Sequence, residues 1–258
     1  MSITNIKAII WDYDGTLVDT RHKNLNVTRN IIENIIETDA EEFSALRSLE
    51  NYSLANRRAS NWRELYRQEL NLTEKQIDEA GRLWTAYQLN DNTEVVFYEG
   101  IEAVISDLAE FPHAIVSQNS RSGIMQNLEK KKLLPYFKHI VGYEEVDLSK
   151  QKPAPDGLLS CMEKLSAIES GYVCSIGDHE TDVRCVRAAN RVLQEENANV
   201  KIFSIGACYE SGMDTSTWDV RPDFEAQKVE DILKIVDKIK GCSARREGGL
   251  RIKGVLRG

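Results

Sequence analysis

The stretch Ile6-Lys7-Ala8-Ile9-Ile10-Trp11-Asp12-Tyr13-Asp14-Gly15-Thr16 decides the fold of this 258-residue chain. Its apolar first half is short and rich in β-branched residues, which is typical of a strand buried on both faces. Two carboxylates, Asp12 and Asp14, follow where the apolar run stops. Open α/β sheets place their ligands at the carboxyl ends of the strands. We therefore expect a site at the end of a buried first strand.

Short apolar runs alternate with helical patterns over the second half of the chain. Strands are indicated at 114–116, 139–141, 172–176 and 200–205, and helices at 155–165, 180–189 and 229–239. This alternation predicts an α/β fold with a parallel sheet covered by helices on both faces. The polar stretch 191–199 leaves two interpretations open, a longer helix or a surface loop.

Residues 18–96 break this alternation, because they carry helical patterns and almost no strand signal. Apolar stripes run along 25–36 and 77–87, and Thr73 with Gln76 predicts a capping box before the second stripe. We expect a helical domain at 18–96, inserted into a core formed by 1–17 and 97–240. The glycine-rich and charged segment 241–258 is expected to be a disordered tail.

The charge balance restricts the possible partners. The chain has 33 basic and 41 acidic residues, a net charge of −8. Such a protein repels a nucleic-acid backbone, and no apolar run reaches the roughly 18 residues that span a bilayer. We expect a cytoplasmic protein with no nucleic-acid or membrane partner. Five cysteines without a CxxC pair and four scattered histidines predict buried free thiols and no zinc site.

Three further polar segments follow the acidic loop in a set order. Ser117 comes after the second apolar strand, Lys152-Pro153-Ala154-Pro155 follows, and Gly177-Asp178-His179-Glu180-Thr181-Asp182 is last. Together with Asp12-x-Asp14-Gly-Thr, this order resembles the haloacid dehalogenase superfamily over about residues 6–240, and more narrowly its phosphoglycolate phosphatase-like branch. The resemblance implies a Rossmann-like core with a parallel sheet and an inserted all-α cap domain.

The resemblance also implies catalytic roles. Asp12 is expected to be a nucleophile that becomes transiently phosphorylated, and Asp14 the general acid and base. Lys152 is expected to neutralise the nucleophile and the phosphoryl group, and Ser117 to donate to a phosphoryl oxygen. For Asn119 two interpretations stay open, a second phosphate donor or a residue that braces its loop.

A metal site is implied by the same motifs. Asp12, the backbone carbonyl of Asp14, and Asp178 form an oxygen set that suits the octahedral shell of Mg²⁺. Asp182, one helical turn after Asp178, has a supporting role, either through water or by orienting Lys152. Four acids that converge without a cation are costly, which favours the metal over the interpretation that these acids only cap a helix.

The acid at position 14 indicates phosphate-ester chemistry, because dehalogenases and phosphonate-cleaving members of the superfamily lack it. We predict a magnesium-dependent phosphomonoester hydrolase that acts on a small phosphorylated metabolite. A phosphomutase of the β-phosphoglucomutase type is the alternative, and a non-catalytic binding module is a third possibility. The candidates for contact with the leaving group are Arg21, His22, Arg57 and Arg58, the last two for a carboxylate or a second phosphate. The motifs do not specify the natural substrate or the oligomeric state.

Overall fold

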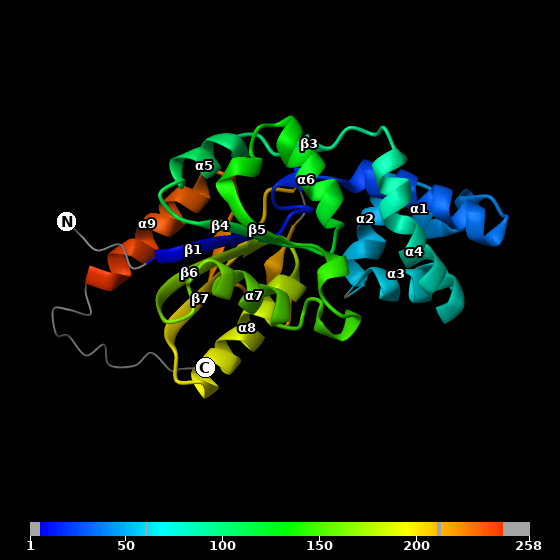
Figure 1. The fold of residues 1–258 in the computed structure, drawn as a ribbon. Coiled ribbons are helices and arrows are strands. Elements are labelled where there is room, and N and C mark those ends of the chain that lie inside the picture. Colours follow the sequence, from blue (N-terminus) through cyan, green and yellow to red (C-terminus); the bar gives the residue numbers. More distant parts are fainter. Residues whose placement is uncertain (1–5, 60, 211–212, 245–258) are drawn as a thin grey trace.

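A six-stranded parallel sheet forms the centre of the computed structural model, which describes residues 6–59, 61–210 and 213–244 (Figure 1). The strand order is β5-β4-β1-β6-β7-β8, so the first strand lies inside the sheet. The strands are β1 (Ile6–Trp11), β4 (His113–Val116), β5 (Phe137–Val141), β6 (Ser170–Gly177), β7 (Asn199–Ala207) and β8 (Phe224–Ala226). The predicted α/β fold with a parallel sheet is confirmed.

Both faces of this sheet are covered by helices. Along β1, Ile9 and Trp11 belong to one apolar cluster, whereas Ala8 and Ile10 belong to another, because successive side chains of a strand point to opposite faces. Helices on the first side are α5 (Ile101–Asp107), α6 (Arg121–Lys130) and α9 (Asp231–Ala244). Helices on the second side are α7 (Asp156–Lys164) and α8 (Glu180–Glu195). The continuous apolar character of β1 follows from this double burial.

A separate group of helices lies beyond the carboxyl ends of the strands (Figure 1). These helices are α1 (Arg21–Ile36), α2 (Leu49–Arg58), α3 (Trp62–Glu69) and α4 (Glu74–Asn90). They enclose their own apolar cluster, in which Leu25, Ile31, Ile32 and Ile77 are buried. The predicted capping box of Thr73 and Gln76 is confirmed at the start of α4. We propose that this group is the cap expected at 18–96.

A two-stranded antiparallel ribbon ties the two ends of this helical segment together. It pairs β2 (Val18–Asp19) with β3 (Val96–Phe97), and Val18 lies opposite Phe97. The sequence gives no signal for these strands, because two residues are too few to show an alternating pattern. The chain therefore leaves the core and returns to it at neighbouring points.

Two helices extend further than the sequence indicated. The helix expected to end near 189 continues to Glu195, so the polar stretch 191–199 begins as a longer helix and β7 follows at Asn199. The closing helix reaches Ala244, so the expected tail at 241–258 is wrong for 241–244, and residues 245–258 lie outside the described residues. Four cysteines are buried and free as expected, while the side chain of Cys242 lies outside the described atoms.

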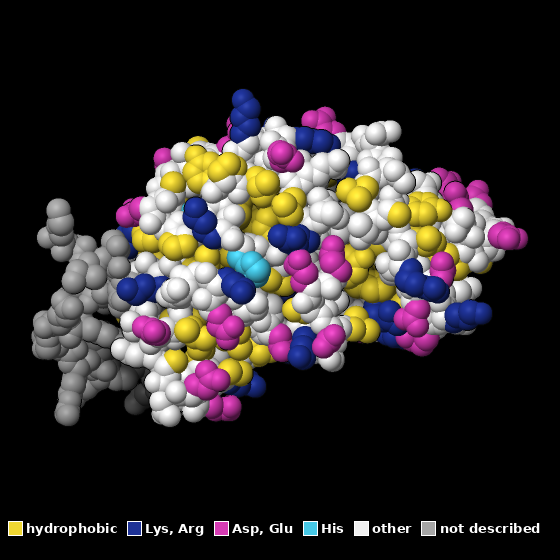
Figure 2. All heavy atoms as spheres, viewed as in Figure 1, with side chains coloured by type: hydrophobic (Ala, Val, Ile, Leu, Met, Phe, Trp, Pro, Cys, Tyr) yellow, Lys and Arg dark blue, Asp and Glu magenta, His cyan; other side chains and the backbone are white. Residues whose placement is uncertain are grey.

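The outer surface is mixed in character. On the face drawn in Figure 2, basic and acidic side chains are interspersed over the sheet domain and the helical group. Among the helices that the structure describes, none is long and apolar enough to cross a bilayer.

Candidate active site

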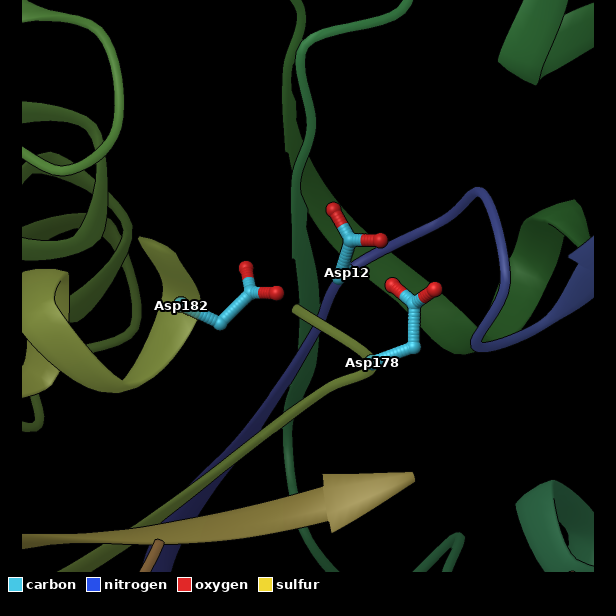
Figure 3. A group of neighbouring side chains, drawn as sticks. All are labelled: Asp12, Asp178 and Asp182. Carbon is cyan, nitrogen blue, oxygen red and sulfur yellow. The ribbon is translucent and has the colours of Figure 1, made fainter. Parts of the chain in front are cut away.

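Neighbouring strand ends bring the acidic motifs together. Asp12 directly follows β1, and its backbone N–H donates to the carbonyl of Ile176 in β6 at 2.7 Å. Asp178 directly follows β6, and Asp182 lies in the first turn of α8. One carboxylate oxygen from each of Asp12, Asp178 and Asp182 lies within 4.8 Å of the others, and the three side chains point into a common space (Figure 3).

Lys152 joins two of these acids. Its Nζ lies 2.6 Å from Oδ1 of Asp12 and 2.6 Å from Oδ1 of Asp182. The lysine side chain is only 8% exposed, so these contacts are shielded from water. Burial by itself lowers the pKa of Lys152, but the two carboxylates outweigh it and the net shift is upward. Lys152 therefore stays charged and is held against Asp12 by a second acid.

Asp178 approaches the first loop closely. A Cβ atom placed on Gly15 lies 1.9 Å from an Asp178 oxygen, and Gly15 has a φ of +73°. Only glycine combines this left-handed backbone with the missing side chain. The close approach of Asp178 therefore explains why a glycine stands at position 15.

The acidic cluster carries more negative charge than its lysine can neutralise. Burial raises the pKa of Asp178 well above its usual value, and the charges of Asp12, Asp182 and Asp14 raise it further. Burial also raises the pKa of Asp12 to about 7, although Lys152 opposes the shift. A bound cation removes this repulsion, and carboxylate oxygens are the ligands that Mg²⁺ prefers. The residues present therefore fit a hard divalent cation held by Asp12 and Asp178.

Asp14 has its own set of hydrogen-bond donors. Its Oδ1 accepts from Nδ2 of Asn119 at 3.0 Å, from Nδ2 of Asn24 at 3.4 Å, and from the hydroxyl of Thr20. Burial raises the pKa of Asp14, while these donors lower it. The structure thus places the Asn119 amide on Asp14, and the Asn119 backbone N–H donates to Oγ of Ser117 at 3.0 Å.

A cavity of about 570 Å³ lies between these residues and the helical group. It is lined by the core candidates Asp12, Asp14, Ser117, Asn119, Lys152, Asp178 and Asp182. Of the cap candidates, Arg21 and Arg57 also line it, and each contacts Glu210, at 2.5 Å and 2.6 Å.

The other two cap candidates lie elsewhere. Arg58 is 65% exposed and pairs with Glu69 outside the cavity, and His22 is exposed and does not line it. Arg57 and Arg58 both belong to the last turn of α2. In that turn their side chains diverge, so one faces the site and the other the solvent.

Several residues that line the cavity were missed by sequence reasoning. Thr20 and Asn24 lie one helical turn apart at the start of α1, and this spacing after the first motif is the signal that could have found them. Glu210 follows β7 in a loop without any periodic pattern. Trp62 and Trp84 come from different helices, and only packing brings them to one wall.

Comparison with known proteins places the chain among related sequences and folds. The family model described as haloacid dehalogenase-like hydrolase matches residues 9–193. A search of curated proteins found no match.

Solved structures agree on the fold. The chain is similar to a predicted phosphatase from Clostridium acetobutylicum, with 23% identity, a TM-score of 0.69, and coverage of 90% of this chain and 98% of that one. It is similar to a predicted phosphoglycolate phosphatase from Haemophilus somnus, with 17% identity, a TM-score of 0.67, and coverage of 90% and 99%. It is also similar to a subfamily IA hydrolase from Geobacter sulfurreducens, with 19% identity, a TM-score of 0.58, and coverage of 91% and 98%.

Proposed function

Because the chain belongs to the haloacid dehalogenase-like hydrolase family, we propose that it is a magnesium-dependent phosphatase that hydrolyses a small phosphomonoester through a phosphorylated Asp12. The observation that supports this proposal is the line of three side chains in which Lys152 bridges Asp12 and Asp182 at 2.6 Å each. Asp12 is thereby oriented by Lys152, which pairs with no carboxylate other than Asp12 and Asp182 among the described residues. The solved relatives named as phosphatases agree with this proposal.

In the first step, a carboxylate oxygen of Asp12 attacks the phosphorus atom, and the bond between phosphorus and the ester oxygen breaks. Asp14 gives its proton to the departing oxygen. The hydrogen bonds from Asn119, Asn24 and Thr20 hold the Asp14 carboxyl in position for this transfer. Ser117, at the end of β4, donates its hydroxyl to a phosphoryl oxygen.

In the second step, Asp14 takes a proton from water, and the water oxygen attacks the phosphorus atom of the aspartyl-phosphate. The bond to Asp12 breaks and inorganic phosphate leaves. Lys152 stays charged throughout and balances the negative charge on Asp12, with Asp182 fixing its position. Asp12, the Asp14 carbonyl and Asp178 are the proposed magnesium ligands; when bound, the ion neutralises phosphoryl charge and screens the nucleophile.

The test is release of inorganic phosphate from a panel of phosphomonoesters, with magnesium and with a chelator. The wild-type protein is expected to turn over only with the metal, and Asp12→Asn is expected to lose about four orders of magnitude or more in turnover. Acid quenching with a substrate labelled in the phosphoryl group is expected to trap the label on wild-type protein and not on Asp12→Asn. Activity that survives in Asp12→Asn at the wild-type level would rule out the proposal.

A further inference from the structure

The wall of the cavity that faces the catalytic residues is aromatic. It is built from α2, α3 and α4, which contribute Tyr52, Trp62, Leu65, Tyr66, Ala80 and Trp84. Trp218, from the loop before β8, lines the cavity from the core side. Three of the four tryptophans in the chain therefore share one cavity. Its volume of about 570 Å³ lies within the usual range for small-molecule sites.

These aromatic side chains are held in place by packing. The rings of Trp62 and Tyr66 meet edge to face with centroids 5.7 Å apart. The hydroxyls of Tyr52 and Tyr66 both contact Oγ1 of buried Thr28, at 3.2 Å and 3.5 Å. The tip of the Trp62 ring lies against Gly81 in the middle of α4, where a Cβ atom would be only 2.8 Å away. A ring surface fixed in this way is prepared before a ligand arrives.

The charges around this wall are already balanced. Apart from Lys152, the basic side chains that line the cavity within the described residues are Arg21 and Arg57. Both contact the single carboxylate of Glu210, and Arg21 also pairs with Asp19 at 2.5 Å. Two further acids, Glu180 and Asp214, line the same cavity. This arrangement offers no surplus positive charge to a carboxylate or a second phosphate on the leaving group.

Two buried polar atoms of residues that line the cavity have no hydrogen-bond partner among the described residues. Oδ1 of Asn24 and Oγ of Ser53 are both buried, make no hydrogen bond within the described structure, and belong to residues that line the cavity. An unsatisfied buried polar atom costs about 1–3 kcal/mol, so these atoms are suited to polar groups of a ligand. The amide nitrogen of Asn24 lies 3.4 Å from Oδ1 of Asp14. A ligand group bound to Asn24 would therefore lie next to the proposed general acid and close to the reacting phosphate.

On these grounds we propose that the leaving group of the substrate carries a planar, uncharged aromatic ring that packs against Trp62 and Trp84, with its polar substituents on Asn24 and Ser53. This inference rests on the proposed phosphatase function and specifies its substrate class. It replaces the expectation that Arg57 or Arg58 binds an anionic group of the substrate. Arg57 is already paired with Glu210, and Arg58 lies outside the cavity.

The test compares substrates that differ by the ring alone. Adenosine 5′-monophosphate and ribose 5-phosphate share the same primary alkyl phosphate, and so do benzyl phosphate and ethyl phosphate in simpler form. Because both members of a pair are esters of a primary alcohol, the ratio of their kcat/KM values measures the contribution of the ring to recognition. We expect the ring-bearing member to be favoured about tenfold or more in at least one pair, since stacking on an aromatic side chain contributes about 1–3 kcal/mol. The pair that shows the larger ratio distinguishes a nucleoside from a directly attached ring. A ratio near one in both pairs would overturn the inference.

Variants of one tryptophan sharpen this test. Trp84→Leu keeps apolar volume but removes the ring, and we expect it to lower the ratio about tenfold, while Trp84→Phe retains most of it. Leu89→Ala, on the exposed side of the same helix at 42% exposure, is the matched control and is expected to leave the ratio unchanged. Equal ratios in Trp84→Leu and the wild type would contradict the proposed ring contact, provided that circular dichroism shows both folded.

A binding measurement separates this inference from the proposed function. Adenosine alone, without a phosphate, is expected to change the tryptophan fluorescence of the wild type saturably, and ribose is not. Loss of phosphate release from every substrate would remove the phosphatase function, whereas Asp12-dependent release without a ring preference or adenosine binding would remove only the aromatic leaving group.

Discussion

The core floor of the cavity and its helical wall differ in chemical character. The floor consists of four acids and one lysine near the strand ends, Asp12, Asp14, Lys152, Asp178 and Asp182, and Lys152 pairs with Asp12 and Asp182. The wall consists of rings fixed by packing, and its arginines are neutralised by Glu210. A phosphoryl group needs fixed charges, whereas a leaving group is distinguished by shape. Under the proposed function, catalysis and substrate selectivity therefore lie in separate parts of this chain.

After Asp12→Asn, the largest effect is expected from Asp178→Asn, which removes one of the acids of the floor. Turnover should fall by at least about a hundredfold, the loss that removal of even an outer partner of a metal site can cause. The melting temperature without metal should rise, because burial and neighbouring acids raise the pKa of Asp178 and make its charge costly.

Thermal melting with and without magnesium measures how Asp178 affects stability and metal binding. Magnesium should raise the melting temperature of the wild type and raise that of Asp178→Asn much less. Asp219→Asn, whose side chain is 86% exposed, serves as the control and should behave like the wild type. An unchanged response to magnesium in Asp178→Asn would show that the cation binds elsewhere.

A smaller effect is expected from Gly81→Ala, which disturbs the wall and leaves the floor intact. The new Cβ meets the Trp62 ring at 2.8 Å, so the ring must shift. The ratio of kcat/KM between adenosine 5′-monophosphate and ribose 5-phosphate should fall several-fold. Alanine is favoured over glycine inside a helix by about 1 kcal/mol, which offsets part of the clash in the free energy of unfolding.

Gly241→Ala in α9 is the matched control, because no atom of the described part of the chain lies within 4 Å of its added Cβ. It should gain the helix stabilisation and leave the substrate ratio alone. A substrate ratio that stays at the wild-type value in Gly81→Ala would show that the position of Trp62 does not set selectivity.

A several-fold change is expected from Glu210→Gln, which alters the charge of the wall. The change removes the carboxylate shared by Arg21 and Arg57, so Arg57 becomes available to an anion while Arg21 keeps its pair with Asp19. We expect kcat/KM for 2-phosphoglycolate to rise relative to ribose 5-phosphate, and added salt to reduce this gain. Arg58→Ala, outside the cavity, is the control and should not alter this comparison. The idea fails if Glu210→Gln shows no new preference for the anionic substrate.

The smallest effect on catalysis is expected from His113, which supports the floor from within the sheet. Its Nδ1 accepts from Nε1 of Trp11 at 2.9 Å, its Nε2 lies 3.0 Å from the Leu108 carbonyl, and burial lowers its pKa to about 4. Below its ordinary pKa of about 6.5, the unfolded chain binds a proton that the native state excludes, so stability falls as pH falls towards 4.

Urea unfolding at pH 7 and pH 5 measures the contribution of His113 to the pH dependence of stability. The wild type should lose about 2 kcal/mol from His113 over this range, and His113→Asn should be less stable at pH 7 but lose less on acidification. Parallel losses in the two proteins would assign the pH dependence to other groups.

The sequence predicted the floor better than the wall, for a physical reason. Asp12 and Asp178 directly follow buried strands, and the ends of neighbouring parallel strands meet in space, so order along the chain fixes proximity. Trp62 and Trp84 meet only through the packing of α3 on α4, which periodicity does not determine. Glu210 follows a strand too, but the loop after β7 carries no motif that distinguishes it.

The elements of the fold also differ in how well the sequence predicted them. Long apolar or amphipathic segments such as β1 and α4 were predicted, because they repeat a pattern several times. The ribbon strands Val18–Asp19 and Val96–Phe97 and the three-residue β8 are too short to repeat any pattern. The end of α9 was missed because Gly241 suggested a stop, although the helix continues to Ala244.

The ribbon of β2 and β3 has a consequence for how such a protein can diverge. Because Val18 pairs with Phe97, the chain between them leaves and rejoins the core at one narrow ribbon. The helical group also contacts the core directly, since Gln88 of α4 accepts from Ser120 and Thr85 of α4 contacts the Tyr143 hydroxyl. Residues between the two strands can be lengthened or replaced without breaking any strand pairing of the six-stranded sheet. Under the proposed function, changes in this segment can alter the substrate while the proposed reaction is kept.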